Sequence, residues 1–149
     1  MTSPEGSSVT FRRPPATLRQ RMITNFARVL ERDVARGCAF DTLITGDAEL
    51  RRLNFSFRGK DYATDVLSFP AAKAGAFLGD IAISLGRARA QAREFGHPIE
   101  HEVQILMLHG LLHLIGYDHE SDTGAMARVE KRWRGKLGLP NGLIERVRA

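Results

Sequence analysis

The sequence predicts one α+β domain, with a small, mostly four-stranded sheet packed against about five helices. The chain has 149 residues, which is enough to bury one hydrophobic core. Strand-like and helix-like segments are mixed along it, and no repeat, low-complexity tract or linker separates them. We therefore expect a loose polar tail over residues 1–7 and a single domain over residues 8–149.

Four segments have the length and polarity of strands. The first is a short edge strand that Pro14 and Pro15 end, and the third is a compact apolar run closed by Pro70. The fourth alternates between apolar and small or polar residues. The expected strands are residues 8–13, 38–45, 65–70 and 79–85, with a loop or hairpin turn over 71–78.

Five segments have helical spacing or boundary signals of helices. Asp47 is a plausible cap of the second, Pro98 suits the first turn of the fourth, and Trp133 belongs to the apolar face of the fifth. The apolar face of the first is made by Leu18, Met22, Phe26, Val29 and Leu30. The expected helices are residues 16–37, 46–60, 86–96, 99–116 and 121–138.

The charge balance is basic, which bears on the class of partner. The chain has 22 Lys and Arg against 17 Asp and Glu, a net charge of +5, and eighteen of the 22 are arginine. The planar guanidinium of arginine suits bidentate phosphate contacts better than lysine does. The composition thus favours a nucleic-acid partner, although an arginine-rich proteome would give the same surface.

Cysteine use and hydropathy indicate the compartment. The single cysteine, Cys38, excludes an internal disulfide framework and fits a reducing cytosol. The first residues lack the apolar stretch of a secretory signal, and the longest apolar run, ILMLHGLLHLIG, is too short to span a bilayer. We expect a cytoplasmic protein that does not bind a membrane.

The segment HGLLHLIGYDH brings three histidines into an otherwise apolar stretch. His109 and His113 are four residues apart, so on a helix their rings point the same way. A continuing helix would carry His119 to another face, but Gly116 can take the left-handed conformation that ends a helix. The chain can then turn back and bring the third imidazole over the first two.

Three imidazoles around one ion, with a fourth position open, describe a catalytic zinc site. A single histidine on an apolar helix face is more often a hydrogen-bonded core residue, but the three together favour a metal. We predict one Zn²⁺ per chain on His109, His113 and His119. His97 and His101 do not share this spacing and are expected at the surface or in a supporting role.

The same histidine spacing occurs in the metzincin proteases, whose motif is H-E-x-x-H-x-x-G-x-x-H. The second residue of that motif is the glutamate that acts as general base, whereas this chain has Gly110 there. A positioned acid–base group contributes roughly 10²–10⁴-fold in rate. The sequence therefore keeps the metal ligands and lacks the protease base.

Further segments complete a resemblance to the YbeY family of bacterial endoribonucleases and rRNA maturation factors. HGLLHLIGYDH is joined, in the family's order, by LNFSFRGKDYATDVLSFP, GDIAIS, Glu102, and Met126 with Glu130. These segments cover roughly residues 7–140. The N-terminal tail and the final PNGLIERVRA carry no family signal.

The resemblance implies a metal-dependent, single-strand-specific endoribonuclease with zinc on the three histidines. It implies a role in 16S rRNA 3′-end maturation and ribosome quality control, with the precursor rRNA and the small ribosomal subunit as partners. It also implies an arginine in the cleft with the metal, and the matching residue is Arg58. Arg58 and His109 are therefore the candidate catalytic residues.

Phosphodiester cleavage needs a nucleophile and stabilisation of charge on the phosphate oxygens. Zinc lowers the pKa of bound water toward ~7 or polarises the phosphate, and Arg58 offers a planar fork to the non-bridging oxygens. Without the resemblance, Arg58 would more often be a solvated loop cation. Candidates for proton transfer, or for orienting a histidine, are Asp118, Glu102 and Asp65. The expected substrate-binding cluster is Arg51, Arg52, Arg58 and Lys60.

Three classes of function stay open at this point. The first is an endoribonuclease acting on rRNA, the second a metallopeptidase related to metzincins, and the third a non-catalytic ribosome assembly factor stabilised by zinc. The sequence does not give the oligomeric state, and a monomer is favoured. It also leaves open whether water or the 2′-hydroxyl of the RNA attacks.

Overall fold

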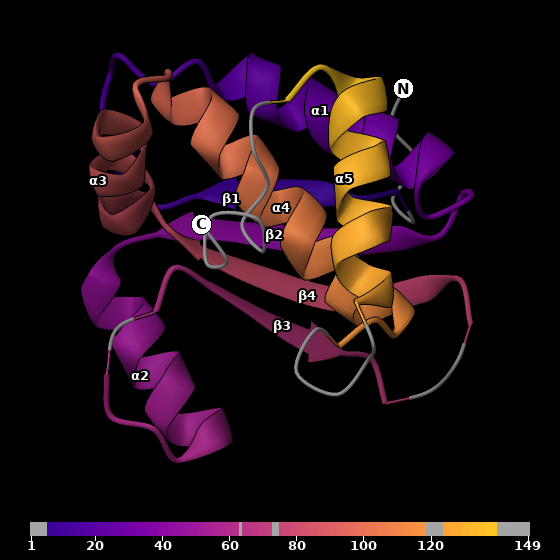
Figure 1. The fold of residues 1–149 in the computed structure, drawn as a ribbon. Coiled ribbons are helices and arrows are strands. Elements are labelled where there is room, and N and C mark those ends of the chain that lie inside the picture. Colours follow the sequence, from indigo (N-terminus) through magenta and orange to yellow (C-terminus); the bar gives the residue numbers. More distant parts are fainter. Residues whose placement is uncertain (1–5, 63, 73–74, 119–123, 140–149) are drawn as a thin grey trace.

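The computed structural model describes residues 6–62, 64–72, 75–118 and 124–139, and its centre is one mixed sheet (Figure 1). The strand order is β1-β2-β4-β3. β1, β2 and β4 are parallel to one another, and β3 is antiparallel to β4. The strands are β1 (Ser8–Phe11), β2 (Ala39–Thr45), β3 (Val66–Pro70) and β4 (Phe77–Ser84). All four expected strands are present, and β4 begins earlier than predicted because Phe77 pairs with Ala39.

In the described part of the chain, five helices accompany the sheet, as the sequence predicts. They are α1 (Gln20–Asp33), α2 (Asp47–Arg58), α3 (Leu85–Phe95), α4 (Ile99–Ile115) and α5 (Ala125–Leu137). The fold is therefore α+β with a four-stranded sheet, as expected. Ser7, expected in the tail, hydrogen-bonds to Glu31 and accepts from the backbone N–H of Phe40.

Several expected boundaries are corrected by the structure. Gly46, not Asp47, is the N-cap of α2, and Asp47 instead accepts a hydrogen bond from the hydroxyl of Ser84. Pro98 is the N-cap of α4 and lies one residue before its first turn. The first shift arises because the contact with Ser84 engages the carboxylate that would otherwise cap the helix. The second is a difference of one residue, which is usual at helix ends.

The strand register decides which side chains meet which helices, because neighbouring side chains on a strand point to opposite faces. Ile81 and Ser68 are paired across β3 and β4 and face α4. Leu67 and Ala82 face the other way and pack against Leu50 of α2. The two faces are therefore covered by different helices.

α4 is the central helix, and almost its whole surface is buried. It packs on β3 and β4 and is flanked by α1, α3 and α5. A helix that is apolar all round is expected in such a position, which explains its run of leucines. Most of the hydrophobic core gathers around it; within this core, Trp133 of α5 is only partly buried.

The buried face of α1 also differs from the prediction. Ile23, Phe26, Ala27 and Leu30 are buried in the helix, whereas Met22 and Val29 are only half-buried. Leu18 is buried but precedes the helix. Within the described part of the chain, no helix is long and apolar enough to cross a membrane.

Candidate metal centre and basic surfaces

Two of the predicted metal ligands lie together on α4. His109 and His113 are one helical turn apart, and both belong to the C-terminal half of the helix. His109 is 4 % exposed, and His113 is half-buried, so the pair lies at the boundary between the core and solvent. Their rings are arranged edge to face, with centroids 4.8 Å apart.

The two ring nitrogens that face each other are at ligand spacing. His109 Nε2 and His113 Nε2 are 3.2 Å apart. Two nitrogen ligands bound at ~2.0–2.1 Å to one tetrahedral zinc ion would be about 3.3 Å apart. The pair therefore fits zinc in both donor type and separation.

Glu130 of α5 orients the first of these rings. Its Oε2 lies 2.7 Å from His109 Nδ1, and both side chains are buried. Because a carboxylate only accepts hydrogen bonds, Nδ1 carries the proton, and Nε2 of the neutral ring keeps its lone pair for a metal. Carboxylate–histidine–metal chains of this kind fix the tautomer and raise the basicity of the ligand.

The role of Glu130 toward His109 is not predicted by the sequence pattern alone. One signal could have found it: Glu130 lies four residues after the fully buried Met126, on the same face of α5. A buried carboxylate needs a partner, since an unpaired buried charge is costly. A search for acids on apolar helix stripes would therefore have singled it out.

α4 ends at Gly116, the glycine that the sequence predicts as its end. Gly116 has a φ of 120° and closes α4, with the N–H of Tyr117 returning to the carbonyl of Leu112. This closure resembles the glycine-dependent ends common to helices. The predicted third ligand, His119, lies outside the described residues. Among the described residues, no cluster of three or more His, Cys, Asp or Glu side chains could hold a metal.

Close packing explains why position 110 has a glycine instead of the glutamate found in the proteases. A Cβ at Gly110 would lie 2.9 Å from Ile81 Cγ2 and 3.2 Å from Ser68 Oγ. The carbonyl of Gly110 also accepts a hydrogen bond from Ser68 Oγ at 2.9 Å. Position 110 thus faces the sheet at close approach, and it has no room for a glutamate.

The predicted substrate-binding residues all belong to α2 or follow it, but they point to different places. Arg58 ends α2, and Lys60 follows the left-handed Gly59. Arg51 is paired with Asp61 at 2.7 Å, and Arg52 lines a cavity at the start of the helix. In the described part of the structure, no hydrogen bond or ion pair joins any of these four to His109 or His113.

Arg58 lines a groove of about 890 Å³ on the face of the sheet that α2 covers only in part. Phe57 lies beside it, 68 % exposed, and its ring contacts Phe69 edge to face at 5.1 Å. Asp41 of β2 and Asp80 of β4 are register partners on neighbouring strands, and both line this groove. Burial, with the nearby Asp41 charge, raises the pKa of Asp80.

The three candidate acids, Glu102, Asp65 and Asp118, differ in their burial and in their hydrogen-bond partners. Glu102 is fully buried and lies 2.7 Å from His97 Nε2. Asp65 accepts a hydrogen bond from Gln91 of α3 at 3.2 Å. Asp118 is exposed and follows directly after the turn that closes α4.

The comparisons with known proteins agree on one family. The profile of the family described as "Endoribonuclease YbeY" matches residues 11–138. A protein of Solibacter usitatus with the same name is 73% identical over 149 residues, which cover 100% of both chains. The chain belongs to the YbeY family. The predicted resemblance is thereby confirmed.

A more distant relative and a solved structure are also similar to this chain. The "Endoribonuclease YbeY" of Nautilia profundicola is 51% identical over 107 residues, covering 71% of this chain and 77% of that protein. A solution structure of a Thermotoga maritima protein superposes with a TM-score of 0.58 at 26% identity, covering 87% of this chain and 91% of the other. The two proteins therefore share their fold at 26% sequence identity.

Proposed function

We propose that this protein is a zinc-dependent, single-strand-specific endoribonuclease that matures the 3′ end of 16S rRNA and serves in ribosome quality control. Family membership supports the endoribonuclease activity and the role in rRNA processing. The 3.2 Å separation of the two facing histidine nitrogens supports the metal. The precursor rRNA and the small ribosomal subunit, in the cytoplasm, are the proposed partners.

Different residues of the chain have different roles in this proposal. His109, His113 and His119 would hold one zinc ion, and Glu130 keeps the proton on Nδ1 of His109. Bound zinc would supply a hydroxide at neutral pH or polarise a phosphate oxygen. The guanidinium of Arg58 binds non-bridging phosphate oxygens, and Arg51, Arg52 and Lys60 bind the strand on either side. The candidates for proton transfer, or for orienting a histidine, are Asp118, Glu102 and Asp65, of which Asp118 is exposed next to the end of α4.

A peptidase function receives less support from this structure. Proteases with this histidine spacing place a glutamate directly after the first histidine, and here that position contacts Ile81 and Ser68 of the sheet. A non-catalytic assembly factor would bind zinc and rRNA, but a folded variant with a changed metal ligand would still support rRNA processing. Both alternatives are outcomes of the experiment below.

The experiment combines metal analysis with cleavage assays. Purified wild-type protein is expected to hold about one zinc per chain and to cleave single-stranded RNA, and a chelator should abolish cleavage. His109→Ala, His113→Ala and His119→Ala should each lose zinc and activity, with circular dichroism as the check on folding. Cleavage of casein in place of RNA would establish the peptidase. Normal rRNA processing by a folded His113→Ala variant would establish the assembly factor.

Arg58→Ala distinguishes metal binding from stabilisation of the phosphate charge during cleavage. We expect zinc content near that of the wild type and cleavage lowered by roughly 10²–10³-fold, as for loss of one charge-stabilising donor. Arg132→Ala, an exposed arginine of α5, is the matched control and should keep its activity. Loss of zinc from Arg58→Ala, or full activity, would show that the assigned role is wrong.

A further inference from the structure

A second basic cavity lies away from the histidine pair, at the carboxyl ends of the parallel strands. It has a volume of about 670 Å³ and is lined by four arginines: Arg12, Arg13, Arg52 and Arg89. Arg12 and Arg13 follow β1, Arg52 belongs to α2 and Arg89 to α3. In Figure 1, this edge of the sheet lies on the side of α3, whereas the histidine end of α4 lies toward α5.

The acids of the cavity are already engaged. Arg12 Nη1 donates to both carboxylate oxygens of Glu49, at 2.7 and 2.5 Å. Glu49 also accepts a hydrogen bond from Thr45 Oγ1 at 2.9 Å. Burial opposes its ionisation, but these hydrogen bonds and the charges of Arg12 and Arg52 outweigh that, so its pKa lies below the usual value. Asp47 accepts from the Ser84 hydroxyl.

Three arginines of the cavity have no carboxylate partner in the part of the chain that the structure describes. Among the described residues, no carboxylate lies within ion-pair distance of Arg13, Arg52 or Arg89. The four arginines against Asp47 and Glu49 leave a net charge of +2 in the lining. Such an excess of cation in a concave site attracts a multivalent anion.

The topology explains why a ligand site is expected here. After β1 the chain crosses through α1 on the face that carries α4, and after β2 it crosses through α2 on the opposite face. Adjacent parallel strands whose connections leave to opposite faces open a crevice at their carboxyl ends, where open sheets bind ligands. The arginine cavity occupies this crevice.

The backbone holds Arg13 at the rim of the cavity. The N–H of Arg12 donates to the carbonyl of Ile44 at 2.9 Å, which fixes the chain to the end of β2. Arg13 has a φ of 51°, and Pro14 and Pro15 follow, so the segment has little freedom to turn the side chain away. The Cα of Arg13 is therefore held at the rim of the cavity.

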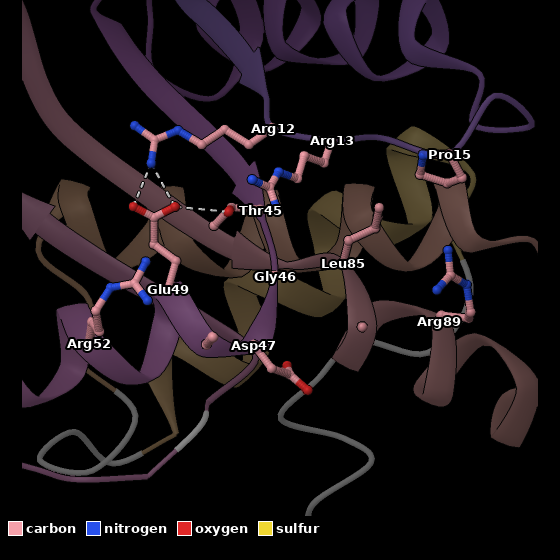
Figure 2. Close-up of a pocket in the computed structure, with 12 residues that line it drawn as sticks. Arg12, Arg13, Pro15, Thr45, Gly46, Asp47, Glu49, Arg52, Leu85 and Arg89 are labelled. Atoms are coloured by element: carbon pink, nitrogen blue, oxygen red, sulfur yellow. Dashed lines mark hydrogen bonds and ion pairs between the residues drawn. The ribbon is translucent and has the colours of Figure 1, made fainter.

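The arginines are spread along the cavity. Figure 2 shows Arg12 and Arg52 on either side of Glu49 at one end, Arg13 between, and Arg89 at the other end. A polyphosphate on a single nucleotide would need cations around one point and a surface for its base. The described lining contains no aromatic side chain, so the arrangement suits successive phosphates of a strand.

We propose that this cavity is a phosphate-binding exosite that holds the backbone of the RNA substrate away from the cleavage site. The inference rests on the proposed endoribonuclease function and extends it: Arg52, already assigned to the substrate, belongs to a contact region that Arg13 and Arg89 complete. Arg13, Arg52 and Arg89 contact phosphates, and Arg12 is held in place by Glu49. The exosite binds the strand regardless of its base sequence, because phosphate contacts carry no sequence information.

The test compares two charge-matched double variants. Arg13→Gln/Arg89→Gln removes two of the proposed contacts, and Lys131→Gln/Arg132→Gln removes two exposed cations of α5. Binding of a labelled single-stranded RNA of about 12 nucleotides is measured in chelator from low to high salt, so that no cleavage occurs. Losing two phosphate contacts should reduce the slope of log K against log salt by about 1.4 and weaken binding about 25-fold at 0.1 M salt.

Each outcome has a defined meaning. The inference is supported if the cavity variant shows these losses, the α5 variant binds as the wild type does, and zinc-loaded cavity variant still cleaves a trinucleotide normally. Equal binding by the cavity variant and the wild type would overturn the exosite while leaving the proposed function intact. Tight binding of ATP that only the cavity variant loses, with RNA binding unchanged, would also overturn it. Failure of the wild type to bind or cleave RNA would instead reject the proposed function.

Discussion

At the scale of single residues, Glu130 decides how His109 can act. A histidine can present either ring nitrogen, and only its partner determines which one is available. The 2.7 Å contact from Glu130 to Nδ1 leaves Nε2 facing His113. The geometry of the candidate metal centre therefore depends on an acid from a different helix.

The contribution of Glu130 to the metal centre can be tested by measuring the affinity for zinc. Glu130→Gln can still accept the hydrogen bond but lacks the charge, so we expect zinc to bind about 10-fold more weakly. Glu130→Ala removes both, and the loss should approach about 100-fold. Competition titration against a zinc chelator gives these affinities, with circular dichroism to verify folding. Unchanged affinity in both variants would rule out the orienting role.

Residue identities could be predicted better than residue partnerships. His109 and His113 were predicted because four-residue spacing on a helix fixes their relation locally. The link to Glu130 was not, because it joins residues 21 positions apart through the packing of α5 on α4. The place of His119 stays a prediction.

At the scale of elements, the close approach of α4 to the sheet depends on Gly110. Its missing side chain lets the helix carbonyl accept the Ser68 hydroxyl, and Val66, Ser68 and Ile81 surround the site where a Cβ would lie. This approach holds the histidine end of the helix against β3 and β4. An apolar helix could lie on the sheet without it, but at a greater distance.

Gly110→Ala tests this packing. The added methyl group must displace Ile81 and Ser68, and we expect it to lower the free energy of unfolding by about 1–3 kcal/mol. Gly135→Ala in α5 is the matched control, since nothing lies within 4 Å of its added Cβ. It should stabilise the protein by about 0.5–1 kcal/mol. Urea denaturation of both variants gives the values, and equal effects would contradict the account.

Element ends were predicted most reliably where a glycine sets them. Gly59, Gly96 and Gly116 each follow the last residue of a helix with a positive φ, close to the expected ends at residues 60, 96 and 116. The first helix is the exception: it was expected to reach residue 37 but ends at Asp33. The starts of helices were less predictable. The carboxylate of Asp47, for example, accepts a hydrogen bond from Ser84, 37 residues away, instead of capping its own helix. The Ser84–Asp47 contact instead connects the ends of β4 and β2 at the edge of the arginine cavity.

At the scale of the whole molecule, one buried carboxylate fastens the start of α1 to α4. Glu100 is 3 % exposed and accepts from the backbone N–H of Arg19 at 2.9 Å and from its guanidinium at 3.4 Å. Burial works against its ionisation, but these contacts prevail and the pKa of Glu100 lies below its ordinary value of 4.5. The ionised form therefore stabilises the folded chain.

This contact predicts how global stability depends on acid. A carboxyl whose pKa is lower in the folded state contributes its full stability above the unfolded pKa, and loses it as the pH falls through the folded pKa. Between pH 7 and about pH 3.5, the wild type should therefore lose more unfolding free energy than Glu100→Gln does. Glu94→Gln, at an exposed site on α3, should follow the wild type. Parallel losses in wild type and Glu100→Gln, measured in urea, would refute this.

The sequence by itself determined the α+β class, the order of strands and helices along the chain, and the histidine pair. These features follow from periodicity, turn residues and helical spacing, which act over a few residues. Only the tertiary structure decided the sheet order β1-β2-β4-β3, the partner of His109 and the gathering of four arginines from three segments. Those depend on how distant elements pack on one core, and local physics does not specify that packing.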